Sequence, residues 1–160
     1  MRHVLFASLG LVLAGCASAP PTVTQQLLGT WSCDAAIGGG NLKGLMTYAE
    51  GGKGTVKLNY TGKMGAQAIV AAGDGDATWK LIEDDTKLES TINTVNLTTV
   101  KIGDRDVPPA MAQSMLAPML AGQTATSTIK LDNANLTLTA TDGTIKACTR
   151  PAVSDRPRPA

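Results

Sequence analysis

The chain has 160 residues, 43% of them hydrophobic, and a formal net charge of +1, which suits one domain with a modest core. It has no run or stripe of basic residues, and this excludes nucleic-acid binding driven by phosphate contacts. No histidine or phenylalanine follows residue 6, so the core must be built mainly from Leu, Ile, Val, Ala and Met.

The N-terminal residues have the pattern of an export signal. A short positive start precedes an apolar run over residues 4–14, which is shorter than the roughly 20 residues of a membrane-spanning helix. The run leads into Leu-Ala-Gly-Cys at residues 13–16, which resembles the lipobox of bacterial lipoproteins. The resemblance implies that residues 1–15 are a signal peptide and that Cys16 becomes the lipidated first residue. The alternative is an ordinary secretory leader that leaves Cys16 as an unpaired thiol.

The same resemblance bears on where the protein resides. The residue after the cysteine is Ala17 and not aspartate, which in lipoproteins favours sorting to the outer membrane. We therefore expect a monomer that is anchored in the outer membrane through the Cys16 lipid and faces the periplasm. Residues 16–27, with small side chains and two prolines, are expected to form the lipidated tether. Residues 150–160, rich in Pro and Arg, are expected to be a disordered tail.

Residues 28–149 have the pattern of an all-β domain. Hydrophobic and polar residues alternate in segments such as 54–61 and 135–141, and clusters of Gly, Asp and Asn separate the segments. Strands are predicted at 29–36, 42–49, 54–61, 64–71, 77–83, 87–101, 123–131, 135–141 and 144–149. Because closure removes exposed strand edges, such a meander favours an antiparallel up-and-down β-barrel of about eight to nine strands.

A short helix is predicted over residues 110–121, inserted before the last strands. Prolines precede it and Gly122 follows it, which are common start and stop signals of helices. Pro118 is expected to kink or break its last turn. Hydrophobic residues recur at helical spacing at Met111, Met115, Leu116, Met119 and Leu120. This stripe either packs as core at one end of the barrel or covers the mouth of an internal cavity, where flexible Met side chains would contact an apolar ligand.

Two cysteines lie in the predicted domain, Cys33 in the first strand and Cys148 in the last. Exported proteins fold in oxidising compartments, and the first and last strands of a closed barrel are neighbours, so we expect a Cys33–Cys148 disulfide. A reactive thiol pair or a metal site is the alternative. Two distant cysteines without histidine make a poor ligand set, and no metal or cofactor is expected.

A second resemblance begins at Gly29-Thr30-Trp31. A Gly-x-Trp at the start of the first strand resembles the entry motif of lipocalins, and the later spacing of Tyr48 and Trp79 is similar to lipocalin-like barrels of bacterial envelopes. The resemblance implies a lipocalin-like (calycin-like) barrel with Trp31 packed at its closed base. It also implies a small apolar ligand or lipid, for which Trp31 and the helical stripe are the candidate contacts.

The alternative to ligand binding is contact with a protein. In architecture the chain also resembles small periplasmic inhibitors of lysozymes or proteases, so a filled barrel would suit an inhibitor of an envelope hydrolase or an assembly accessory. The acidic residues Asp74, Asp76, Asp84 and Asp85 are then the candidate surface, if they are not ordinary solvated turn residues. We expect no enzyme, because the mature chain has no histidine base and no Gly-x-Ser-x-Gly motif.

Overall fold

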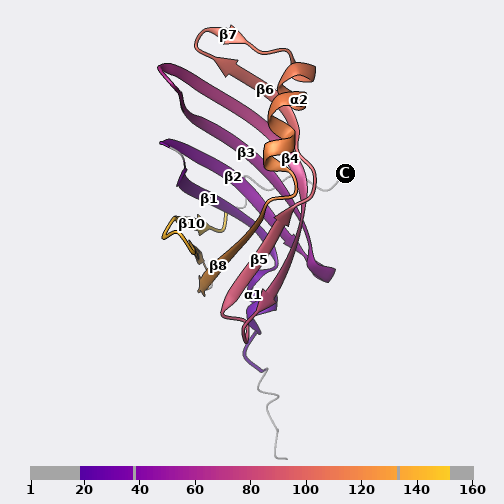
Figure 1. Ribbon diagram of the computed structural model, residues 1–160. Helices are drawn as coiled ribbons and strands as arrows, with labels where there is room; N and C mark the ends of the chain where they lie inside the picture. Colours follow the sequence, from indigo (N-terminus) through magenta and orange to yellow (C-terminus); the bar gives the residue numbers. More distant parts are fainter. Residues whose placement is uncertain (1–18, 38, 133, 152–160) are drawn as a thin grey trace, which may run out of the picture.

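Antiparallel strands curl into a closed barrel in the computed structural model (Figure 1). The structure describes residues 19–37, 39–132 and 134–151. The strands are β1 (Gly29–Ile37), β2 (Gly40–Ala49), β3 (Lys53–Met64), β4 (Gln67–Ile82), β5 (Lys87–Ile92), β6 (Asn96–Ile102), β7 (Arg105–Asp106), β8 (Thr124–Leu131), β9 (Asn135–Ala140) and β10 (Ile145–Thr149). The helices are α1 (Val23–Leu27), the 3-10 turn η1 (Glu50–Gly52) and α2 (Pro109–Leu120). The described strands of the barrel wall follow the order β1-β2-β3-β4-β5-β8-β9-β10 and return to β1, so the predicted all-β barrel is confirmed.

The barrel closes where the first and last strands meet. β1 and β10 are antiparallel, and Cys33 lies directly opposite Cys148 in their register. The two cysteines form a disulfide across this seam, with an S–S distance of 2.09 Å, and they lie 115 residues apart in the sequence. The predicted Cys33–Cys148 disulfide is therefore confirmed.

Strand β4 corrects two of the predicted boundaries. The expected strands 64–71 and 77–83 are parts of one continuous strand, and the predicted turn at residues 73–76 lies within it. Its glycines serve close packing, because a Cβ on Gly73 would lie only 2.6 Å from the carbonyl oxygen of Asn96 on β6. The expected strand 87–101 is divided into β5 and β6, which pair with successive halves of β4.

The upper half of β4 carries β6, β7 and α2 beyond the barrel wall (Figure 1). The helix was predicted from residue 110 to 121 and runs from Pro109 to Leu120, between β7 and β8. It continues past Pro118, and the Ala121 N–H donates to the Ala117 carbonyl at 2.8 Å, so the last turn keeps its hydrogen bond. A small second core forms beneath it from Ala71, Val95, Leu97, Val100, Ala112 and Ala117.

Helix α1 lies at the opposite end of the barrel from α2 (Figure 1). It falls in the segment that we expected to be a tether. Thr22 and Gln25 form a reciprocal capping box, in which each side chain accepts the other residue's backbone N–H. Leu27 at its end is fully buried in the main core. The Thr-x-x-Gln spacing was the sequence signal for this helix.

Several predictions concern residues outside the described part of the chain. The signal peptide (1–15) and Cys16 lie there, as does the predicted tail from residue 152 onward. In the ranges that are described, no helix has the length and apolar character needed to cross a membrane.

Removal of the disulfide should weaken the fold strongly. Replacing both Cys33 and Cys148 with Ala should lower the free energy of unfolding by about 2–5 kcal/mol, since the cross-link restricts a long loop of the unfolded chain. Urea titration of the oxidised protein and the double variant measures this difference. A reducing agent should lower wild-type stability and leave the double variant unchanged. A loss below about 1 kcal/mol, outside the usual range for such a cross-link, would contradict the prediction.

Candidate functional site

The end of the barrel at α1 is sealed around Trp31. Its side chain has 0% exposure, and its indole N–H donates to the Leu27 carbonyl of α1 at 2.8 Å. The guanidinium of Arg150 lies over the ring at 3.8 Å from the centroid, a cation–π contact. Trp31 thus packs as the plug that the lipocalin resemblance implied.

Two further aromatic residues fill the space beside this plug. The rings of Tyr48 and Trp79 meet edge to face with centroids 5.6 Å apart. The Trp79 indole N–H donates to the carbonyl of Lys53 at 2.7 Å and to that of Ala49 at 3.2 Å. Burial raises the pKa of the Tyr48 phenol well above its usual range, so this group stays neutral. The closed end of the barrel is therefore filled by side chains of the main hydrophobic core.

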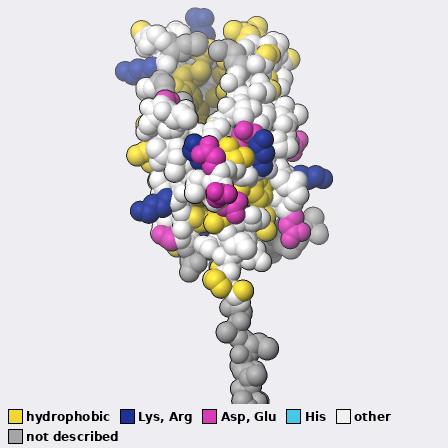
Figure 2. Space-filling model, turned by 60° about the horizontal axis from the view of Figure 1, so that its bottom comes forward, with side chains coloured by type: hydrophobic (Ala, Val, Ile, Leu, Met, Phe, Trp, Pro, Cys, Tyr) yellow, Lys and Arg dark blue, Asp and Glu magenta, His cyan; other side chains and the backbone are white. Residues whose placement is uncertain are grey.

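An internal cavity of about 80 Å³ lies on the other side of Trp31, toward the β1–β2 hairpin. Its lining comes from the inward faces of five strands: Cys33, Ala35, Leu42, Gly44, Met46, Val56, Leu58, Ile92 and Lys146. A hollow with hydrophobic side chains at its base is visible in the upper, more distant part of Figure 2.

The strand register explains why space remains in the barrel here. Cys33, Gly44 and Leu58 are neighbours across β1, β2 and β3, and the next layer toward the hairpins contains Ala35 and Leu42. Ala35 and Gly44 are therefore the small members of two adjacent layers. A Cβ on Gly44 would lie 2.6 Å from the Lys57 carbonyl oxygen, so this position accommodates no larger residue without a shift of the backbone.

Lys146 is the one charged residue that lines this cavity. It lies opposite Ala35 on β1 and Leu138 on β9. Burial lowers the pKa of its amine, because desolvation disfavours the ammonium form. Sequence reasoning missed this residue, although the signal was present. Side chains alternate along a strand, so Lys146 points to the same side of β10 as Cys148, two positions away, whose side chain points inward.

Helix α2 presents a different face from the one predicted. Met111 and Met115 are 53% and 60% exposed, and Leu120 is also exposed. The buried positions are Ala112 and Ala117, and Leu116 packs partly against them; the side chain of Met119 is outside the described set. The expectation that the Met stripe packs as core is wrong for Met111 and Met115.

The structure does not support the other expectation, that the stripe covers the cavity, because none of the α2 side chains that the structure describes lines the cavity. Two interactions orient the helix on β6 instead. The Gln113 side chain accepts the Leu97 backbone N–H at 2.9 Å and donates to the Val95 carbonyl. The small side chains of Ala112 and Ala117 allow this close approach, which turns the methionines outward.

The four acidic residues considered as one surface lie at separate places. Asp74 and Asp76 are on β4 and accept hydrogen bonds from Asn96 and Thr94. Asp84 lies beyond the end of the strand, in the β4–β5 turn with Asp85, and at 3.3 Å per residue Asp76 and this turn are about 20 Å apart. Among the residues that the structure describes, no group of three or more acidic or cysteine side chains could hold a metal ion.

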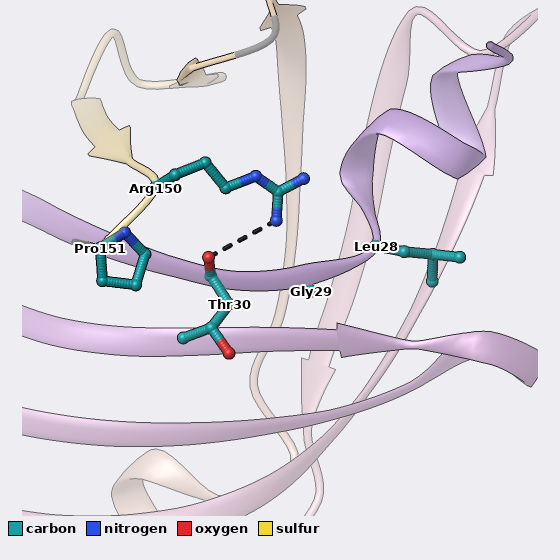
Figure 3. A pocket seen from close by; sticks show the side chains of 5 residues that line it. All are labelled: Leu28, Gly29, Thr30, Arg150 and Pro151. Carbon is teal, nitrogen blue, oxygen red and sulfur yellow. Dashed lines mark hydrogen bonds between the residues drawn. The ribbon is translucent and has the colours of Figure 1, made fainter. Parts of the chain in front are cut away.

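A depression of about 380 Å³ on the outside of the closed end is lined by Leu28, Gly29, Thr30, Arg150 and Pro151. Figure 3 shows the Arg150 side chain extending from the end of β10 across β1 toward α1. Its guanidinium donates to the carbonyls of Gln26 and Thr30. The side chain of Arg150 therefore connects the end of β10 to β1 and to α1.

Ser127 and Lys130 have the Ser-x-x-Lys spacing of some serine hydrolases. Both lie on β8, where Ser127 is buried and Lys130 is exposed. Because residues three apart on a strand point to opposite faces, this pair cannot form a nucleophile and its base.

The internal cavity is the candidate site on geometric grounds. It combines an apolar lining with one half-buried lysine, whereas the outer depression is lined by Arg150, whose guanidinium is bound to backbone carbonyls. The sequence matches no protein-family model and no curated protein.

Truncation of Arg150 should destabilise the closed end. Arg150→Ala loses the contact with Trp31 and two charged hydrogen bonds, so we expect the free energy of unfolding to fall by about 2–4 kcal/mol. Urea unfolding followed by tryptophan fluorescence measures it. Arg105→Ala, at an exposed position of β7, is the matched control and should change stability by no more than about 0.5 kcal/mol. Equal effects of the two variants would refute this role of Arg150.

Proposed function

We propose that the protein is a lipid-anchored envelope lipoprotein whose lipocalin-like barrel binds a small apolar ligand, or one end of an apolar chain, without catalysis. The observation that supports binding is the apolar cavity that extends from the level of Met46, past the Cys33–Cys148 disulfide, to Ala35 and Leu42 near the β1–β2 hairpin. Sites for drug-sized ligands have volumes of about 300–1,000 Å³, and an apolar cavity of about 150 Å³ holds a benzene ring. At about 80 Å³, this cavity suits a segment of a few carbon atoms.

The size of the cavity also sets the expected affinity. Each methylene group that leaves water contributes about 0.8 kcal/mol, so three or four contribute about 2–3 kcal/mol. Contacts at the mouth add to this, and a total near 5 kcal/mol corresponds to a dissociation constant of roughly 0.2 mM. The proposed ligand is therefore bound weakly and exchanges rapidly.

The proposed anchor is Cys16, with the mature chain on the periplasmic side of the outer membrane as a monomer. The lipobox-like residues 13–16 and Ala17 support this. Helix α1 follows the anchor closely in sequence, and the six residues 17–22 span at most about 20 Å. The closed end of the barrel would then be near the bilayer, and the end that carries α2 would point away from it (Figure 1).

A variant that fills the cavity tests ligand binding. Ala35→Leu places extra carbons in the cavity, so the affinity for 1-hexanol, followed by NMR titration, should fall at least tenfold while the melting temperature is unchanged or higher. Ala112→Leu is the matched control, because Ala112 is buried on the inner face of α2, in the second core, and does not line the cavity. It should lower the melting temperature through overpacking and leave 1-hexanol binding intact.

Two results would count against this function. One is an absence of 1-hexanol binding to the wild-type protein, and the other is equal binding by wild type and Ala35→Leu. Either result would favour the alternative role, contact with an envelope protein. The exposed Met111 and Met115 on α2 would then be the first positions to test, since methionine is common at adaptable interaction surfaces.

The anchor is tested by expressing the full chain in a bacterium with two membranes. Wild-type protein should fractionate with the outer membrane, and its mass should correspond to a chain that starts at a lipidated Cys16. Cys16→Ser should appear in the soluble fraction with an unchanged melting temperature. The Cys33→Ala/Cys148→Ala variant is the control and should remain in the membrane. An unlipidated wild-type mass would contradict the proposal.

A further inference from the structure

Lys146 is a half-buried lysine at an apolar cavity, and even partial removal of a charged group from water is costly unless an opposite charge is supplied. Lys146 lies in the layer that contains Ala35 and Leu42, on the hairpin side of the disulfide. No hydrogen bond or ion pair is found for its amine within the described residues, so none of these residues supplies a counter-charge there.

The surroundings of Lys146 are neutral on every packed element. β1 contributes Ala35 and the oxidised Cys33, and β9 contributes Leu138. The remaining lining residues, from β2, β3 and β5, are Leu42, Gly44, Met46, Val56, Leu58 and Ile92. The nearest phenols belong to Tyr60, next to Leu42 in the register, and to Tyr48, which lies in the sealed end against Met46.

We propose that the ligand of this cavity is a short-chain monocarboxylate, whose carboxylate pairs with the ammonium group of Lys146. This inference rests on the proposed function and specifies its ligand class. The carboxylate lies at the level of Ala35 and Leu42, and the alkyl chain extends past Gly44 toward Met46. A carboxylate has the charge that the apolar lining lacks, and a chain of few carbons fits the space of about 80 Å³.

The geometry also specifies which end of the ligand is inside. Leu42, Gly44 and Met46 follow one another along the inward face of β2, and their distance from the closed end decreases in that order. Lys146 lies level with the first of them, so its charge is near the mouth and the fully apolar layers are deeper. An alkyl chain that enters first would leave its carboxylate at the depth of the amine.

Comparison of hexanoate with 1-hexanol tests the inference, because the two probes share a six-carbon chain and differ in charge. NMR titration at pH 7 should show that wild-type protein binds hexanoate at least tenfold more tightly than 1-hexanol. Lys146→Met should reduce hexanoate affinity at least tenfold and leave 1-hexanol affinity unchanged or higher. Lys146→Arg keeps the charge and should retain the preference for hexanoate.

Lys57→Met is the matched control, because Lys57 is an exposed lysine on β3 between two residues that line the cavity. It should bind both probes as wild type does. Equal wild-type affinities for the two probes, or equal effects of Lys146→Met on both, would overturn the carboxylate inference and leave apolar binding in place. If neither probe binds wild-type protein, the proposed function fails and the inference fails with it.

Discussion

The pairing of β1 with β10 is the contact on which the remaining structure depends. Four residue pairs form this seam, and the Cys33–Cys148 disulfide lies within it. Without the seam, β1 and β10 would be the edges of an open sheet and the inward faces of both strands would be exposed to water. Arg150, the first residue described after β10, extends the same connection by contacting Trp31 and the carbonyl of Gln26. Covalent, aromatic and hydrogen-bonding contacts thus hold the two ends of the folded chain at one place.

The contents of the barrel change along its axis. The end next to α1 contains three of the large aromatic side chains, Trp31, Tyr48 and Trp79, whose polar atoms have partners. At the level of the disulfide and in the next layer toward the hairpin two inward residues are small, Gly44 and Ala35, and a cavity remains. A chain with few aromatic residues has too little side-chain volume to fill both halves, so it packs one half fully. The tightly packed aromatic layers and the cavity are thereby found at different levels of the barrel.

The part of the sheet outside the barrel has its own small core. β4 is long enough to pair with β5 in its second half and with β6 in its first, and α2 packs on β6. Helix packing there depends on two alanines and on the hydrogen bonds of Gln113 with the backbone of Val95 and Leu97, at the start of β6. This arrangement covers the extension, and none of the described side chains of α2 lines the cavity.

The sequence by itself determined the class of fold, most strand positions, the helix before the last strands and the disulfide. Alternation with a period of two, turn residues and cysteines in the terminal strands are local signals, and the structure agrees with them. The capping box at Thr22 and the inward direction of Lys146 were also encoded locally, through residue spacing and strand alternation.

Only the tertiary structure decided the remaining features. Gly73 suits either a turn or a close backbone approach, and the position of β6 selects the second. Both Met and Ala faces of α2 have helical periodicity, but backbone groups of Leu97 on β6 and of Val95 just before it bind Gln113 and so bring the alanines to the sheet. The size of the cavity depends on which small residues become neighbours across strands, here Gly44 beside Cys33 and Ala35 in the next layer. Such pairings join residues that are distant in sequence, so no local pattern contains them.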